Sequence, residues 1–294
     1  MNPRSGLFKG IPALIISLGR PRNVDLRPSL EEFGFEVFDV SGVDGRNLSA
    51  MDLNRVQQET ATRIHGRPMT AGEIGCSLGH LSAYDMARSL DADWTLVCED
   101  DAIIRPNIVN LQGVLQSLPR TSPLVLNLYS YVGNPWRRKG LVHIHGPIEQ
   151  GGTQVVGRYF KPPQMALAYC LTRSAVGWAA SRTTVDGGPD WPLWADNLDF
   201  WGVYPWMATP MPSVPSLIDP DGDGRVLPND QRGSVFSPGR RLGYLLPRVA
   251  STWAGALGGW RPYMSRVAIP RTHEQLSRIR QSVIEGVEGG PFIR

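Results

Sequence analysis

The sequence predicts an α/β fold in which a mostly parallel sheet is flanked by helices. Short apolar runs alternate with amphipathic stretches through the first half of the 294-residue chain. This alternation is typical of βαβ units, which build parallel sheets. Hydrophobic residues make up 41% of the chain, which is enough for a sizeable core. We expect a main domain over residues 1–230 and a basic, partly helical extension over residues 231–294.

Each element of the first half has a local signal in the sequence. We expect strands over residues 11–18, 35–40, 94–98 and 124–132, and helices over residues 27–33, 49–63 and 70–90. Gly34 stops the first helix, and Asp44 with Gly45 marks a turn. Ser49 and Thr70 each precede an acidic residue by three positions, the capping-box pattern that begins a helix.

The second half of the chain is less regular. A hairpin or long loop is expected over residues 143–159, followed by a strand that turns into a helix over residues 168–181. Residues 187–220 are rich in Pro and Trp, which favours irregular, ordered surface. The chain is basic from Arg232 onward, and a capping box at Thr272 predicts a short helix.

Composition narrows the class of protein. Cys76, Cys98 and Cys170 lie far apart in apolar contexts, which argues against a disulfide scaffold and a zinc cluster and favours a reducing compartment. The first ten residues lack the apolar core of a secretory signal, and no apolar run reaches about 18 residues. Lysine is scarce, and no nucleic-acid-binding motif is present. We therefore expect a cytoplasmic protein that binds no nucleic acid.

Three consecutive carboxylates, Glu99, Asp100 and Asp101, follow the predicted strand over residues 94–98. In an open α/β sheet, ligands bind beyond the carboxyl ends of the strands. Adjacent carboxylates repel one another unless a positive group joins them. Mg²⁺ and Mn²⁺ prefer oxygen ligands and commonly bind with a phosphate-bearing substrate. The pattern therefore indicates a divalent-cation site, with an acidic, solvent-facing turn as the alternative.

A row of chemically versatile side chains follows one side of the helix predicted over residues 70–90. At about 100° per residue, Glu73, Ser77, His80 and Tyr84 lie within about 60° of one another. A solvated helix face is the alternative, although such a face more often carries lysine. Three glycines would allow another backbone or a ligand to approach this helix closely. They are Gly72, Gly75 and Gly79.

Two motifs together carry a resemblance to a known family. Residues 70–80, Thr-Ala-Gly-Glu-Ile-Gly-Cys-Ser-Leu-Gly-His, resemble the GE-x-GC-x-x-SH signature of glycosyltransferase family 25, with Gly79 in place of the usual Ser. Residues 99–102 are similar to its EDD metal motif, at a fitting spacing. Weaker similarities extend the resemblance to residues 11–218. They lie at Ile15–Leu18, Val43–Gly45, Ala168–Ala175, Gly188–Asp190 and Val203–Ser216.

The resemblance implies a GT-A-like (Rossmann-like) fold and metal-dependent transfer of a galactose-like sugar from a UDP-sugar donor. The implied acceptor is a surface glycan or glycolipid, such as lipopolysaccharide. Glu99 and Asp101 are implied as ligands of Mn²⁺ or Mg²⁺. The implied donor-binding residues are Ser17, Leu18, Arg22, Asp44, Glu99 and Asp100. Two alternatives stay open: a catalytically inactive relative that binds a glycan or partner, and a metal-dependent phosphoesterase.

Acceptor attack requires a base near the anomeric carbon. Asp190 is the first candidate, because it matches the family aspartate and lies in a Trp-rich stretch, with Asp196 and Asp199 as further candidates. Glu73 and His80 are candidates for the same role, or for supporting the segment that carries the predicted metal ligands.

Two features near the C-terminus fall outside this resemblance. Residues 219–230 match a D-x-D-x-D-G calcium loop, with a Gly/Asp-rich surface turn as the alternative. The extension interleaves arginines with Trp253, Trp260, Tyr244 and Tyr263. This combination suits an anionic membrane surface and a lipid-linked acceptor, which would place the protein on the inner face of the membrane. A helical cap on the core is the alternative.

Overall fold

The computed structural model describes residues 6–19, 21–65, 67–129, 141–151, 154–159, 163, 165–187, 198–211 and 264–268. Its strands are β1 (Pro12–Ser17), β2 (Glu36–Ser41), β3 (Trp94–Glu99), β4 (Ala102–Ile104), β5 (Leu124–Asn127), β6 (Leu141–Gly151), β7 (Gln154–Tyr159), β8 (Ala168–Thr172), β9 (Asp199–Tyr204), β10 (Ala208–Pro210) and β11 (Met264–Ala268). Its helices are α1 (Leu26–Phe33), α2 (Ala50–Asn54), α3 (Gln58–His65), α4 (Ala71–Leu90), the 3₁₀ helix η1 (Pro106–Asn110), α5 (Leu111–Ser117) and α6 (Arg173–Ala180).

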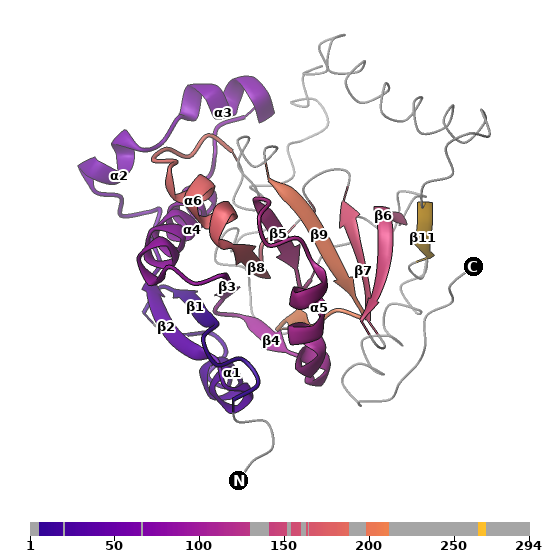
Figure 1. The fold of residues 1–294 in the computed structure, drawn as a ribbon. Helices are drawn as coiled ribbons and strands as arrows, with labels where there is room; N and C mark the ends of the chain where they lie inside the picture. The colour runs from indigo at the N-terminus through magenta and orange to yellow at the C-terminus, as the bar shows by residue number, and fades with distance from the viewer. Residues whose placement is uncertain are drawn as a thin grey trace, which may run out of the picture.

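Nine of these strands form one sheet in the order β11-β6-β7-β9-β5-β8-β3-β1-β2 (Figure 1). Strands β1, β2 and β3 are parallel, and so are β5 and β9. Strand β8 lies between β3 and β5 and is antiparallel to both, so β2, β1, β3, β5 and β9 all run in one direction. The expectation of a mostly parallel central sheet is confirmed.

Helices cover both faces of this sheet. Ala13 and Ile15 of β1 pack in one core cluster with side chains of α1 and α5. Leu14 and Ile16 point to the other face, where they pack with α4 and α6. Alternate residues of a strand point to opposite faces, so β1, β3, β5, β8 and β9 each contribute to both clusters. Figure 1 shows α4 and α6 lying together on their face, with α5 on the other.

An antiparallel group extends the sheet beyond β9. Strand β7 pairs with β9, β6 pairs with β7, and β11 pairs with β6, all in antiparallel register. The hairpin expected over residues 143–159 is therefore confirmed as β6 and β7. Within the expected extension, the structure describes residues 264–268, and they form a strand. The helix predicted from Thr272 and the calcium loop over residues 219–230 lie outside the described residues.

The helix predicted over residues 49–63 is instead two helices, α2 and α3. Ser49 caps α2 through Asp52, as expected. The helix breaks because Val56 forms a β-bridge with Val185, and the Gln57 N–H donates to the Val185 carbonyl at 2.8 Å. These contacts replace the hydrogen bonds that a continuous helix would make. No residue near Val56 in the sequence indicates that Val185 will pair with it.

Residues 187–220 are more regular than expected. Strand β9 lies in the interior of the sheet, and Phe200 and Val203 are buried. Strand β10 pairs with β4, which directly follows the acidic residues. Strand β4 was not expected from the sequence, whereas β10 lies within the Val203–Ser216 segment that resembles the closing strand region of the family. Strand β5 is shorter than the predicted strand over 124–132, since it ends at Asn127. Among the described helices, none is both long and apolar enough to cross a membrane.

Candidate functional site

The predicted acidic edge lies where three parallel strands end together. Ile16 of β1 is in register with Glu99 of β3, and Ser17 is in register with Ser41 of β2. The segments that follow β1, β2 and β3 therefore emerge at one edge of the sheet. These segments carry the predicted residues Leu18, Asp44, Asp100 and Asp101. Leu18 is 44% exposed, whereas Asp100 is buried.

Arg22 supplies positive charge to this edge. Its Nε donates to Asp100 Oδ1 at 2.7 Å, and its Nη1 lies 3.2 Å from Asp101 Oδ2. Burial acts to lower the pKa of Arg22, but the charges of Asp101 and Asp100 outweigh it and raise that pKa. The structure thus joins two predicted donor-binding residues, Arg22 and Asp100, in one ion pair beside the predicted metal ligand Asp101.

Backbone contacts hold the acidic segment in place. The Asn23 side chain donates to the Ala102 carbonyl at 2.6 Å, and the Asn23 N–H donates to the Asp100 carbonyl at 2.9 Å. The Met211 N–H donates to the Asp101 carbonyl at 2.9 Å. Sequence reasoning missed Asn23. Its one available signal was its place beside Arg22 in a loop at a strand end, where an amide can bond to a neighbouring backbone.

Asp101 carries a buried oxygen without a hydrogen bond. Its Oδ1 has no partner among the described residues, although its Oδ2 is paired with Arg22. Burial raises the pKa of Asp101 to about 6, Glu99 and Asp100 add to this, and Arg22 opposes it. An unsatisfied carboxylate oxygen beside two further acids suits a hard divalent cation. The residues present therefore fit the Mg²⁺ or Mn²⁺ that the sequence predicts.

The raised pKa of Asp101 has a consequence for stability. The unfolded aspartate has a pKa of about 3.9, so between about pH 4 and 6 the folded chain holds a proton that the unfolded chain has lost. Without added metal, we expect this group's contribution to fall over that range by at most about 3 kcal/mol. Urea unfolding of wild type and Asp101→Asn from pH 4 to pH 8 measures it. The exposed Asp39→Asn is the control, and identical pH profiles for Asp101→Asn and wild type would contradict the prediction.

Glu99 contacts two residues of α4. Its Oε1 lies 3.4 Å from His80 Nε2 and accepts from the Cys76 thiol at 3.7 Å. Burial acts to raise the pKa of Glu99, but neighbouring His80, Arg22 and Cys76 outweigh it, and the pKa is lowered. Glu99 is therefore ionised at neutral pH. Cys76 was not among the predicted site residues, although its spacing of four from His80 was a usable signal.

The polar row on α4 is buried, so the solvated-face alternative is wrong. Ser77, His80 and Tyr84 are each less than 5% exposed. His80 Nδ1 lies 2.7 Å from the hydroxyl of Tyr169, which donates to the Tyr84 hydroxyl at 3.2 Å. Tyr169 comes from β8 and was missed, because its hydroxyl lies within an apolar strand sequence. A buried tyrosine hydroxyl usually has a partner, and here that partner is the predicted residue His80.

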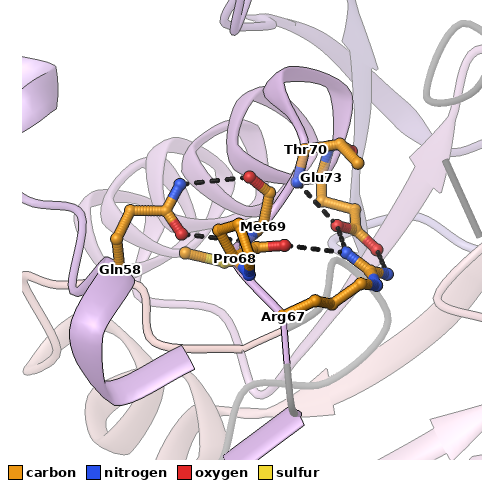
Figure 2. Close-up of polar contacts among 6 residues, drawn as sticks. All are labelled: Gln58, Arg67, Pro68, Met69, Thr70 and Glu73. Carbon is orange, nitrogen blue, oxygen red and sulfur yellow. Dashed lines mark hydrogen bonds and ion pairs between the residues drawn. The ribbon is translucent and has the colours of Figure 1, made fainter. Parts of the chain in front are cut away.

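Glu73 is held at the first turn of α4 (Figure 2). Its Oε2 accepts from the Thr70 N–H at 2.8 Å, and Arg67 donates to both carboxylate oxygens at 2.6 and 2.7 Å. Gln58 exchanges two hydrogen bonds with the Met69 backbone beside them. Burial acts to raise the pKa of Glu73, but the bonds from Arg67 and Thr70 outweigh it and lower that pKa. These contacts support a positioning role.

Removing Arg67 tests that arrangement. We expect Arg67→Ala to lower the free energy of unfolding by about 2 kcal/mol, because it leaves the buried Glu73 carboxylate with the Thr70 contacts alone. Arg63→Ala on the exposed side of α3 should change it by less than about 0.5 kcal/mol. Chemical denaturation measures both variants. Equal stability of the two variants would show that the ion pair contributes nothing.

The loop after β2 packs directly on α4. A Cβ at Gly45 would overlap the Ala71 carbonyl oxygen, and one at Gly75 would overlap the Val43 carbonyl oxygen. The close backbone approach expected from the glycines of this helix is therefore confirmed at Gly75. Asp44 accepts from the Arg46 side chain at 2.8 Å, which with further bonds lowers its pKa to about 2.

The predicted bases are not all at this edge. Asp190 and Asp196 lie outside the described residues. Asp199 begins β9, where it is in register with Leu124 at the start of the parallel strand β5, and it accepts from Trp201 Nε1 at 3.0 Å. It therefore lies at the edge opposite Glu99, because parallel strands begin at one edge and end at the other. The candidacy of Asp199 as a base at the acidic edge is wrong.

Comparison with known proteins points to a family of glycosyltransferases. Residues 11–144 match the family model of glycosyltransferase family 25 (LPS biosynthesis protein). A glycosyltransferase 25 family member of Aedes aegypti is 35% identical over 82 residues, which are 26% of this chain and 14% of that protein. One of Anopheles gambiae is 34% identical over 89 residues, 29% of this chain and 15% of that protein. Procollagen galactosyltransferase 2 of Homo sapiens is 36% identical over 77 residues, 25% of this chain and 12% of that protein.

The matched segments thus span less than a sixth of those relatives. The family match contains both the capped helix α4 and the acidic edge after β3. Over residues 11–144, this chain is therefore similar to glycosyltransferase family 25.

Proposed function

We propose that this protein is a metal-dependent glycosyltransferase. It moves a galactose-like sugar from a nucleotide-sugar donor, a UDP-sugar, to a surface glycan or glycolipid such as lipopolysaccharide. The observation that carries the proposal is the acidic edge after β3, where Asp101 presents a buried, unpaired oxygen close to Glu99. The family match over residues 11–144 supports the reaction class, and the donor and acceptor follow from the family resemblance.

Glu99 and Asp101 would hold Mn²⁺ or Mg²⁺, and a bound cation would neutralise charge on the departing diphosphate. The protein's own residues prepare that edge. Arg22 adds positive charge beside it and orients Asp100. Ser17 ends β1, and Leu18 and Asp44 follow β1 and β2 at the same edge; all three are proposed to contact the donor.

We assign acceptor activation to Asp190, on the family resemblance and its Trp-rich neighbourhood. His80 and Glu73 are better suited to positioning. His80 lies against Glu99 and is fixed by Tyr169, whereas both oxygens of Glu73 are engaged by Arg67 and Thr70. Rate measured against pH for Asp190→Ala tests the assignment. An unchanged profile would remove Asp190 from the role.

The proposed activity is tested with a panel of nucleotide sugars, measuring hydrolysis and transfer with and without Mn²⁺. We expect turnover of at least one UDP-sugar that requires the cation. A specific observation supports a second candidate, an inactive glycan- or partner-binding relative: Arg22 already neutralises part of the acidic edge. Donor binding without turnover across the panel would favour that candidate.

We further propose that the basic extension contacts an anionic membrane surface that carries the acceptor. Its arginines and aromatic residues support this, as does the lipid-linked acceptor that the family resemblance implies. Flotation with anionic liposomes, comparing the full chain with a truncation after Asp230, tests the proposal. Flotation of both forms, or of neither, would contradict it.

A further inference from the structure

Cys76, His80 and Glu99 bring three different metal-binding atoms together beneath the acidic edge. Cys76 and His80 are four residues apart on α4 and project from the same side of the helix, and Glu99 ends β3 opposite them. The thiol sulfur, the imidazole Nε2 and the Glu99 Oε1 all lie within 4.8 Å of one another. His80 is buried, and the Glu99 side chain is 20% exposed.

Two of the separations among these atoms are close to the edge lengths of a metal-coordination tetrahedron. Zinc binds sulfur at about 2.3 Å and nitrogen or oxygen at about 2.0–2.1 Å, so its ligand atoms lie about 3.3–3.6 Å apart. Here Nε2 and Oε1 are 3.4 Å apart, and Sγ and Oε1 are 3.7 Å apart. The first distance is long for a hydrogen bond, whose usual range is about 2.7–3.2 Å. We propose that these three residues form a site for zinc or a similar transition-metal dication.

The second nitrogen of His80 is arranged as in known metal sites. Metal-binding histidines usually donate their other ring N–H to an oxygen, which fixes the ring and its tautomer. The Tyr169 hydroxyl donates to Tyr84, so its oxygen can accept from His80 Nδ1 at 2.7 Å. A bound cation would select this tautomer, with a lone pair on Nε2 beside Glu99 Oε1, whereas without a cation Nε2 can instead donate to Oε1. A cation between these two atoms satisfies both.

Charge and ligand type separate this site from the proposed donor site. The negative charges of one thiolate and one carboxylate would balance the two positive charges of a dication, and a metal-bound neutral imidazole adds no charge. Such a balance suits a site that is half-buried to buried. A sulfur ligand favours zinc or cobalt over magnesium and manganese, whereas the edge at Asp101 offers oxygen alone. Glu99 is shared, because its Oε1 faces Cys76 and His80 and a carboxylate has a second oxygen. The proposed site uses one cysteine, so it differs from the cysteine-rich zinc cluster that the sequence spacing argues against.

Three protein ligands leave a fourth position for water or another small ligand. The site would also join α4 to the end of β3, and so hold the proposed donor site in place. It requires neither a sugar donor nor glycosyl transfer, and therefore goes beyond the proposed function.

Cobalt binding to the metal-free full-length chain tests the inference. We expect one equivalent of Co²⁺ to give the visible d–d bands of tetrahedral cobalt and a thiolate-to-cobalt charge-transfer band, both removed by Zn²⁺. Cys76→Ser should lose the charge-transfer band, and His80→Gln should weaken Co²⁺ binding by at least about tenfold. Cys170→Ala is the matched control, since Cys170 is buried on the sheet face opposite α4, and it should keep the bands. Absence of the charge-transfer band in wild type, or its persistence in Cys76→Ser, would overturn the inference.

A second measurement uses the wild-type chain, so it does not depend on the folding of any variant. Alkylation of each cysteine by iodoacetamide is followed by peptide mass mapping. Zn²⁺ should slow alkylation of Cys76 by at least about tenfold, and an unchanged rate would overturn the inference. Asp101→Asn should keep the cobalt bands even where it loses Mn²⁺-dependent sugar transfer. Failure of the proposed function and failure of this site are thereby distinguishable.

Discussion

Asp101→Asn is expected to lower metal-dependent nucleotide-sugar turnover by at least about a hundredfold while the chain stays folded. The substitution keeps the shape of the side chain but removes the charge from an oxygen that is buried and unpaired. The pKa of about 6 means that most of the wild-type carboxyl is ionised at pH 7.5, where a cation can bind it. Initial rates over a Mn²⁺ titration, with circular dichroism as the folding check, measure the effect.

The matched control for this experiment is Asp39→Asn. Asp39 lies on β2 with its side chain 71% exposed, and its ion pair with Arg27 is at the surface. Surface ion pairs of this kind contribute about 0–1 kcal/mol to the free energy of unfolding, so we expect wild-type rates and near-wild-type stability. Turnover by Asp101→Asn that equals the control at saturating Mn²⁺ would remove Asp101 from the proposed metal site. Rates that fall in both variants would point to a general loss of folding.

Gly45→Ala is expected to destabilise the fold by more than about 3 kcal/mol, the upper range for overpacking. A Cβ at this position would overlap the Ala71 carbonyl oxygen in the first turn of α4 and would also press on the Gly75 backbone nitrogen. Neither neighbour is a flexible side-chain end, so the loop after β2 would have to move away from α4. Urea denaturation measures the loss of stability, and a lowered yield of soluble protein would accompany it.

Gly113→Ala is the contrasting control. Gly113 lies within α5, and a Cβ there would meet no atom within 4 Å. Alanine is favoured over glycine in a helix by about 1 kcal/mol, so this substitution should stabilise the protein slightly. Opposite signs for the two glycine substitutions are therefore expected. A Gly45→Ala variant as stable as Gly113→Ala would show that the loop does not pack on α4 as described.

The features that could be predicted from the sequence are those with local causes. The capping box of Thr70 and Glu73 begins α4 because each residue bonds to the other's backbone N–H within one helical turn. Gly34 ends α1 in the left-handed conformation that glycine readily adopts. The apolar strand ending in Glu99 predicted the acidic edge, because ligand sites form where parallel strands end. The family resemblance, which the profile match confirms over residues 11–144, rested on these same motifs.

Local sequence signals therefore determined β1, α1, β2, α4 and β3, their order and the acidic edge, because helix caps, turns and periodicity depend on neighbouring residues. Which distant residues contact one another was decided by the tertiary structure. It split the helix expected over residues 49–63 through a bridge to Val185, and it made β9 an interior strand. It also placed Arg22 on the acidic residues and Tyr169 against His80, 89 positions away in the chain. Such contacts depend on how strands align and helices pack across the whole sheet, which no local pattern specifies.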